Sequence, residues 1–332
     1  MDITFFHWAY GDDSSIKRSF TPLISELKKT NTIKEFSVPY KGANPINVLR
    51  NILFVYKHRN KRGINHVTGD IHYCILGLMG VKSVLTIHDD YAYTQAHRGI
   101  LDKFYKWILW LYLPIKIADK VLCISPNTKQ AIDRLVHNKK TIVLTHNCIN
   151  NKYKQYPLQN NPQPIVLQIG TLPQKNLETT LKAIAGLNIQ LHIIRPMTPE
   201  QRKLAESLNI KFTNLYDLSD EEVINEYINA DIVLFPSLKE GFGMPIIESQ
   251  AIGRPVITSN IQPMKWVAGD NYPLLIDPLS PQSIKDTIIK LLKNKDLYHS
   301  AIKKGIENSK RFTIVTIYNN FISLYTKLIS NE

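Results

Sequence analysis

Two glutamates, Glu240 and Glu248, have the residue type and spacing to do chemistry. They flank seven residues of the stretch "KEGFGMPIIESQAIGRPV" (239–256), in which Gly241 and Gly243 permit close approach to the backbone. Two carboxylates at this spacing could form an acid/base pair, bind a metal ion, or hold different parts of a polar ligand. The residues around them favour the third use.

A helix is predicted to begin inside this stretch, because Pro245 suits the first helical position and Gly253 suits the end of a short helix. The preceding run "DIVLFPS" (231–237) has the composition of a buried strand. Backbone N–H groups and the positive helix end would therefore lie beside Glu240. Glu248, about one turn into the helix, would reach the same place. A carboxylate there suits two hydrogen bonds from a vicinal diol such as a ribose.

Apolar, β-rich runs alternate with segments of helical period in the first half of the chain. This alternation predicts a parallel sheet covered by helices on both faces. The expected strands are residues 3–9, 64–69, 81–89, 120–125 and 140–147, and the expected helices include residues 14–29 and 127–136.

The same rhythm restarts after the polar, proline-bearing segment 151–164, where we place the domain boundary. Strands are expected at residues 165–170, 190–195, 211–216, 231–237 and 254–259, with helices from about Leu177, from about Pro199 and over residues 220–230. Two doubly wound sheets in succession predict a cleft between domains, with ligands at the carboxyl ends of the strands. The expected domains are residues 1–155 and 164–315, and residues 316–332 are expected to form a helix that packs back on the first domain.

The positive charge of the chain belongs to its first half. Residues 1–163 contain 23 Lys and Arg against 11 Asp and Glu, whereas residues 164–332 contain 18 against 17. Such a half would be attracted to phospholipid, a pyrophosphate-linked acceptor or nucleic acid, although a solvated basic face is the ordinary alternative. Nucleic acid is the least favoured partner, because no recognised nucleic-acid motif accompanies the charge.

Residues 100–120 combine aromatic and basic side chains on one expected helix. This composition suits a membrane interface, and the alternative is a core helix that Pro114 ends. No stretch has the roughly 18 apolar residues of a membrane span. Cys74, Cys123 and Cys148 are too widely spaced for a disulfide framework or a zinc ribbon, which favours a reducing compartment.

Several familiar cofactor and nucleophile motifs are absent from the sequence. It contains no G-x-G-x-x-G after the first expected strand, no G-x-x-x-x-G-K-[ST], and no G-x-S-x-G. Hydride transfer, P-loop NTP hydrolysis and nucleophile-elbow chemistry are therefore disfavoured.

The two-glutamate stretch, preceded by "ADIVLFPS", resembles the hallmark of retaining GT-B glycosyltransferases of the GT4 type. The resemblance extends to "IVLQIGTLPQKNLETTLKAI" (165–184), "VLTIHD" (84–89) and "ADKVLCISPNTKQAI" (118–132), in the family's order. It implies two Rossmann-like domains that face a central cleft, with the acceptor on the first and a nucleotide-sugar donor on the second.

The resemblance also implies residue roles at the donor. Glu248 would bind the ribose, Glu240 the transferred sugar, and Lys175 the diphosphate, whose developing charge a lysine and backbone donors can meet without a metal ion. The implied donor-binding residues are Gly11, Gly170, Thr171, Lys175, Glu240, Gly241, Phe242, Gly243, Met244 and Glu248. An ordinary turn explains Gly11 almost as well.

His88 matches the family's histidine near the reaction centre, so His88 and Glu240 are the expected catalytic residues. His66, Asp70, His72 and Asp89 are expected on the acceptor side. Histidines and carboxylates are also legitimate metal ligands, but nothing fixes their spacing as a ligand set, and we expect neither a metal ion nor another cofactor.

Two positions depart from the family pattern. Thr171 follows Gly170 where many members have an arginine nearby as a second diphosphate contact, and Lys265-Trp266 stands where Pro-Glu is common. Phosphate binding would then depend more on Lys175 and the helix end.

The expected function is transfer of a sugar from a UDP- or GDP-linked donor to a hydroxyl of a glycan or lipid-linked acceptor, with retention of configuration, in bacterial surface polysaccharide assembly. The alternative is a sugar-nucleotide epimerase or hydrolase of the same architecture. We expect a cytoplasmic protein with peripheral contact at the inner face of the cell membrane, for which Lys57, Arg59, Lys61 and Arg62 are candidates.

Overall fold

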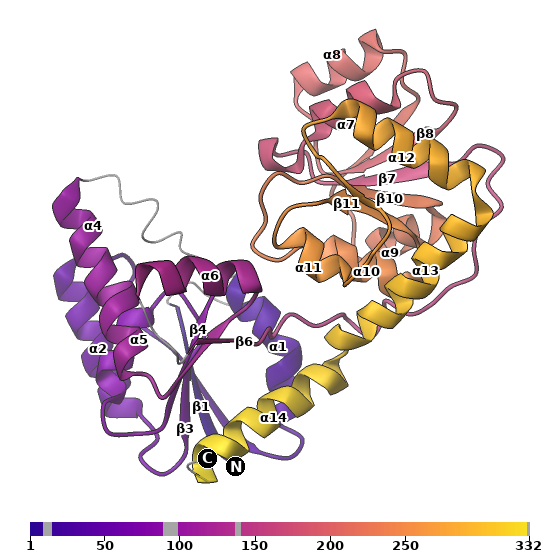
Figure 1. The fold of residues 1–332 in the computed structure, drawn as a ribbon. Coiled ribbons are helices and arrows are strands. Elements are labelled where there is room, and N and C mark those ends of the chain that lie inside the picture. Colours follow the sequence, from indigo (N-terminus) through magenta and orange to yellow (C-terminus); the bar gives the residue numbers. More distant parts are fainter. Residues whose placement is uncertain (9–14, 89–98, 137–140, 331–332) are drawn as a thin grey trace. The chain divides into compact units, whose positions relative to one another are not determined.

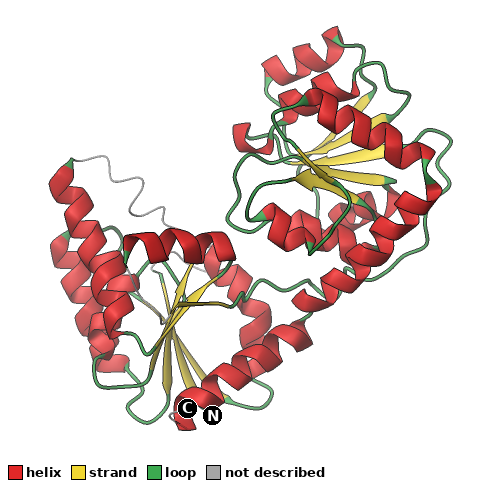
Figure 2. Ribbon diagram, viewed as in Figure 1, coloured by secondary structure: helices red, strands yellow, loops and turns green. Residues whose placement is uncertain are grey.

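The computed structural model describes residues 1–8, 15–88, 99–136 and 141–330. The chain divides into two compact units, unit 1 (Met1–Cys148 and the chain from Ile314) and unit 2 (Ile149–Thr313). Each unit is a sheet covered by helices on both faces, as Figures 1 and 2 show.

Unit 1 contains a sheet of six parallel strands in the order β2-β1-β3-β4-β5-β6. The strands are β1 (Asp2–His7), β2 (Thr32–Ser37), β3 (Ile64–Val67), β4 (Ser83–Ile87), β5 (Lys120–Cys123) and β6 (Thr141–Val143). The helices are α1 (Ser15–Leu27), α2 (Pro45–His58), the 3-10 helix η1 (His72–Leu78), α4 (Ile100–Lys106), the π-helix η2 (Trp107–Tyr112), α5 (Leu113–Ile117), α6 (Pro126–Leu135) and α14 (Ile314–Ser330).

Successive side chains of these strands enter two separate cores, because a strand points its residues alternately to opposite faces. Phe5 and Val84 pack with α1 and α14 on one face. Phe6 and Leu85 pack with α2, α5 and α6 on the other. The C-terminal helix α14 is therefore part of the core of unit 1.

Unit 2 contains a second sheet of six parallel strands in the order β12-β11-β10-β7-β8-β9. The strands are β7 (Ile165–Ile169), β8 (Gln190–Ile194), β9 (Phe212–Leu215), β10 (Ile232–Phe235), β11 (Val256–Ser259) and β12 (Leu275–Ile276). The helices are η3 (Pro173–Lys175), α7 (Leu177–Ile184), α8 (Pro199–Ser207), α9 (Asp220–Asn229), α10 (Met244–Ile252), α11 (Met264–Ala268), α12 (Pro281–Lys293), α13 (Lys295–Ser309) and η4 (Lys310–Phe312). Figure 1 shows α7, α8 and α12 on one face of this sheet and α9, α10 and α11 on the other.

The polar segment at residues 151–164 is fastened to unit 2 and is not a free linker. Tyr156 donates its backbone N–H to the Ile252 carbonyl, and the buried Arg254 guanidinium donates to the carbonyls of Tyr156 and Pro157 at 3.1 and 2.6 Å. The chain passes between the units at Cys148/Ile149 and again at Thr313/Ile314.

Three elements of unit 1, β2, α2 and η1, were not expected from the sequence. A further difference concerns residues 100–120, where Pro114 does not end the helix. The chain continues from α4 through the π-helix η2 into α5, and Pro114 lies in the first turn of α5, where a residue without an N–H is tolerated.

Phe321→Ala should destabilise unit 1 by about 3–5 kcal/mol, because this α14 side chain is fully buried between the sheet and α1. Urea unfolding would measure the loss. Val315→Ala, on the same helix but 62% exposed, is the control and should change stability little. Equal effects of the two substitutions would contradict the place of α14 in the core.

Candidate active site

The order of the strands in unit 2 reverses between β7 and β10. Connections leave these two neighbours in opposite directions, so the loops after their carboxyl ends diverge and leave room for a ligand. The loop after β7 carries Gly170, Thr171 and Lys175, and the loop after β10 carries Glu240 and Gly241. Residues expected at the donor from distant parts of the sequence therefore lie together.

Lys175 and Glu240 form an ion pair at this point. Lys175 Nζ lies 2.5 Å from Glu240 Oε1, and the side chains are 21% and 14% exposed. The ammonium also lies 4.9 Å from the centre of the Phe235 ring, at the end of β10. The loops thus present a cation and a carboxylate side by side.

Gly170 allows Lys175 to lie in this position. Its φ is +93°, and a Cβ atom there would approach Lys175 Cγ to 2.7 Å. Asn176, with φ +63°, donates its side-chain amide to the carbonyls of Pro236 and Pro278, and so fastens this loop to the loops after β10 and β12. A bulkier residue at position 170 would push the lysine away from Glu240.

Thr171 faces its own unit. Its hydroxyl donates to the Pro196 carbonyl at 2.6 Å, and its carbonyl accepts from the Gln201 amide at 2.8 Å. The threonine that departs from the family pattern therefore holds the loop in place.

Phe242 is one of the expected donor-binding residues. It is buried, with its ring packed edge-on against Trp266 and Phe312. An aromatic side chain in this cluster supports the turn from behind, so only the backbone of Phe242 remains available to a ligand. Trp266, which also departs from the family pattern, packs in the same aromatic cluster.

Gly241 and Gly243 shape the turn before α10. Gly243, with φ +110°, is the N-terminal cap of α10, and Met244 is the first helical residue. A Cβ atom at Gly241 would meet nothing within 4 Å, so the turn is open at that residue. Pro245 follows as the second residue of α10.

Glu248 lies in the middle of α10, partly buried beside two tyrosines. Its Oε2 accepts a hydrogen bond of 2.7 Å from the hydroxyl of buried Tyr227, whose ring packs against Tyr153. Burial raises the pKa of Glu248 to about 7, against the lowering effect of the Tyr227 hydrogen bond, and Asp220 adds a smaller increase. The carboxylate form, which accepts hydrogen bonds from a diol, therefore dominates only above neutral pH.

In unit 1, His88 follows the carboxyl end of β4. Its Nε2 lies 2.8 Å from the Thr68 carbonyl oxygen, so Nε2 carries the proton and donates it. Gly69 makes room for the ring, because a Cβ atom there would approach His88 Cδ2 to 2.6 Å. The ring also contacts His146, a buried residue that the sequence did not single out.

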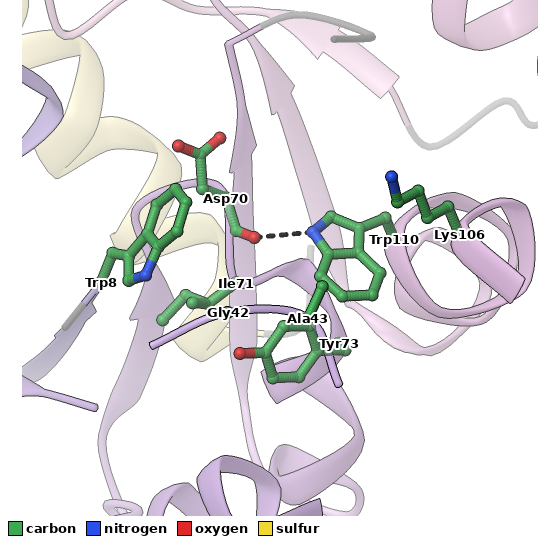
Figure 3. A pocket seen from close by; sticks show the side chains of 8 residues that line it. All are labelled: Trp8, Gly42, Ala43, Asp70, Ile71, Tyr73, Lys106 and Trp110. Atoms are coloured by element: carbon green, nitrogen blue, oxygen red, sulfur yellow. Dashed lines mark hydrogen bonds between the residues drawn. The ribbon is translucent and has the colours of Figure 1, made fainter. Parts of the chain in front are cut away.

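A pocket of about 310 Å³ lies near the carboxyl ends of β1 and β3 of the same sheet. Figure 3 shows Trp8 and Trp110 on either side of Asp70, with Tyr73 below. Asp70 has φ +52°, and its carbonyl accepts a 2.7 Å hydrogen bond from the Trp110 indole. The lining residues are Trp8, Gly42, Ala43, Asp70, Ile71, Tyr73, Lys106 and Trp110.

Asp70, one of the residues expected on the acceptor side, lines this pocket, whereas His66 and His72 do not and need correction. His66 is fully buried, hydrogen-bonded to the hydroxyls of Tyr325 and Thr86, and burial lowers its pKa to about 3. His72 is buried behind the pocket wall, donates to the Trp110 carbonyl, and has its pKa lowered by burial to about 4. Both histidines are neutral and structural.

Gly11 and Asp89 lie outside the described residues. Within the ranges that the structure describes, no group of three or more His, Cys, Asp or Glu side chains is arranged to hold a metal ion. The aromatic residues Trp8, Tyr73 and Trp110 were missed because a tryptophan in an apolar sequence gives no sign of whether it faces a core or a pocket.

Two family models match the chain, one after the other. The model described as glycosyl transferases group 1 matches residues 149–308, and the model described as glycosyltransferase family 4 matches residues 22–153. Together they extend over most of both units.

Individual relatives agree with these matches. The chain is 23% identical over 322 residues to an uncharacterised glycosyltransferase of Methanocaldococcus jannaschii, covering 94% of this chain and 86% of the relative. It is 24% identical over 273 residues to the O-antigen chain mannosyltransferase B of Escherichia coli, covering 74% and 71%. The fold is that of HepE from Anabaena, solved in complex with UDP and glucose, with a TM-score of 0.73, 13% identity, and coverage of 98% and 100%.

Glu248→Gln should stabilise the protein in a pH-dependent way. Because the folded state keeps Glu248 protonated between the ordinary pKa of 4.5 and about 7, stability falls as pH rises through this window. The glutamine avoids this cost and still accepts from Tyr227. Its advantage should grow by roughly 2–3 kcal/mol from pH 5 to pH 8 in urea unfolding. Glu206→Gln, at an exposed site on α8, is the control, and an advantage that does not change with pH would contradict the assignment.

Proposed function

The chain belongs to the group 1, family 4 glycosyltransferases, and from this we propose that it moves a sugar from a nucleoside diphosphate donor to a hydroxyl of a glycan or lipid-linked acceptor. The Lys175–Glu240 pair at the strand-order reversal of unit 2 is the observation that carries the proposal. It offers one charge of each sign to a ligand that has an anionic diphosphate next to a sugar rich in hydroxyls.

The donor would be held at three points. Lys175 neutralises the diphosphate, and the open backbone at Gly241 lets the ligand approach the turn. Glu240, released from the lysine by the phosphate charge, accepts hydrogen bonds from the sugar hydroxyls. Glu248 in its carboxylate form accepts both hydroxyls of the ribose.

The reaction is proposed to retain the anomeric configuration. A retaining glycosidase uses two carboxyl groups on the reacting sugar, one of them as a nucleophile. Here the assigned glutamates hold different parts of the donor, which favours a front-face reaction in which the leaving phosphate takes the proton of the acceptor hydroxyl. His88 is assigned to the reaction centre, with its ring orientation fixed by the hydrogen bond to Thr68.

The acceptor would bind unit 1 in the pocket of Trp8, Asp70 and Trp110. Aromatic faces pack against the apolar faces of sugar rings, and a carboxylate accepts hydrogen bonds from their hydroxyls. A backbone with φ +52° at Asp70 is a strained conformation of the kind that clusters at functional sites. The E. coli O-antigen relative suggests surface polysaccharide assembly as the biological setting. The protein would act there as a peripheral protein at the inner face of the cell membrane.

Lys175→Met should weaken binding of both the nucleotide and the nucleotide sugar by roughly ten- to hundredfold, because a charged hydrogen bond to phosphate is lost. Glu240→Gln should weaken binding of the nucleotide sugar more than binding of the bare nucleotide. Thermal stabilisation by UDP, GDP and their sugar derivatives would measure both affinities. Lys182→Met, an exposed lysine of α7, is the control. The donor assignment fails if Glu240→Gln weakens binding of the nucleotide and of the nucleotide sugar equally. It also fails if the Lys175→Met variant binds both ligands as tightly as the wild type.

His88→Ala should lower turnover by roughly two to three orders of magnitude while donor-induced stabilisation stays unchanged. Turnover is measured as nucleoside diphosphate released from the bound donor, with water or a glycan as acceptor. His299→Ala, at an exposed site on α13, should be fully active. Efficient conversion of the donor into an isomeric nucleotide sugar without any acceptor would point to an epimerase instead.

A further inference from the structure

Helix α2 exposes a stripe of large apolar side chains. Ile46, Leu49, Leu53 and Tyr56, the α2 stripe, are 63%, 57%, 50% and 54% exposed. Their spacing of three, four and three residues places them within an arc of roughly 80° on the helix. Val48, Asn51 and Val55 lie on another side of the helix and are buried in unit 1. The helix is therefore apolar both toward its own core and toward solvent, which marks an interaction surface.

Basic side chains border the α2 stripe. Arg50 and Lys57 are exposed and project roughly 20–40° from the line of Ile46. Just beyond the helix, the guanidinium of Arg59 lies 3.6 Å from the centre of the Tyr56 ring. The sequence of α2, PINVLRNILFVYKH, contains no acidic residue. Long basic side chains on the border of an apolar stripe can reach anionic headgroups while the stripe enters the acyl boundary.

Helix α4 adds a second exposed apolar group near the start of α2. Ile100, Leu101 and Phe104 are 82%, 80% and 58% exposed. The Tyr105 hydroxyl donates to the Ala43 carbonyl at 3.1 Å, two residues before α2 begins, and Figure 1 shows α4 next to α2. Unit 1 thus has exposed apolar side chains on two helices.

We infer that the α2 stripe is a docking surface for an anionic lipid bilayer. A bilayer supplies both an apolar layer and negative headgroups, whereas a second copy of this surface would bring two basic, acid-free faces together. No helix in the described ranges is long and apolar enough to cross a membrane. Its use, to bring the enzyme to a lipid-linked acceptor, rests on the proposed function.

The test is sedimentation of the whole protein with vesicles of phosphatidylcholine, with and without phosphatidylglycerol. The wild type should bind the anionic vesicles, and more weakly as salt rises. The double variant Leu49→Glu with Leu53→Glu should lose roughly tenfold or more in binding, since two inserted side chains become charged. Val315→Glu with Leu279→Glu makes the same charge change at residues 62% and 74% exposed, and should bind as the wild type.

A second pair of variants tests the basic border. Arg50→Ala with Lys57→Ala should reduce binding to anionic vesicles and flatten its salt dependence, whereas Arg202→Ala with Lys203→Ala on α8 should not. Donor-induced thermal stabilisation of every variant should equal that of the wild type, so a failure of the proposed function would appear there and not in sedimentation.

Three results would overturn the inference. The first is a wild-type protein that does not sediment with anionic vesicles at low salt. The second is a Leu49→Glu/Leu53→Glu variant that binds them as well as the wild type. The third is a change of oligomeric state in that variant without vesicles, which would make the α2 stripe an interface between copies of the chain.

Discussion

All strands in both described sheets run parallel, and this constraint determines where the chemistry can be. Parallel strands need crossover helices, so every carboxyl end lies at one edge of its sheet and every loop that follows a strand gathers there. In unit 2 the connections also diverge at β7 and β10. Lys175 and Glu240 are 65 residues apart, yet they meet because each belongs to the loop after one of these two strands.

The ion pair has a consequence for ligand exchange. Two opposite charges that are 21% and 14% exposed have lost much of their hydration, and their attraction offsets that loss. The net free energy of such an ion pair is close to zero. Replacing one side chain of the pair by a ligand group of the same charge therefore changes the free energy little. Under the proposed function, a diphosphate would take the place of Glu240 on Lys175, and sugar hydroxyls would then take the place of Lys175 on Glu240.

Strands with buried residues gave the clearest signal in the sequence. β1, β3, β7 and β10 are buried along nearly their whole length, and all appeared as short apolar runs. β2 was missed because it pairs with β1 alone at an edge, and its residues TIKEFS are mostly exposed, which leaves no hydrophobic pattern. The domain boundary was placed on the polar segment 151–164, although polarity does not reveal that Arg254 fastens that segment to unit 2.

That two distant residues come together is easier to predict from the sequence than whether a side chain faces a ligand. Lys175 and Glu240 come together because they lie in the loops after two neighbouring strands and carry opposite charges. His66 and His72 could not be separated from ligand-facing histidines by sequence, because a buried neutral histidine needs only hydroxyl and carbonyl partners supplied by distant segments such as α14 and η2.

Helix α2, which was not predicted, lies in the part of the chain that carries the excess positive charge. Apolar side chains lie on its exposed side as well as on its buried side. Residues 1–163, which include most of unit 1, carry 23 basic against 11 acidic residues. Residues 164–332, which include most of unit 2 and nearly all of the expected donor residues, are close to balanced, at 18 against 17. A small anion can be bound by one lysine at short range, whereas attraction to an extended anionic surface depends on many charges acting together. The excess charge thus accompanies the unit with the exposed apolar helix, as expected if that unit meets a surface and the other unit meets a small molecule.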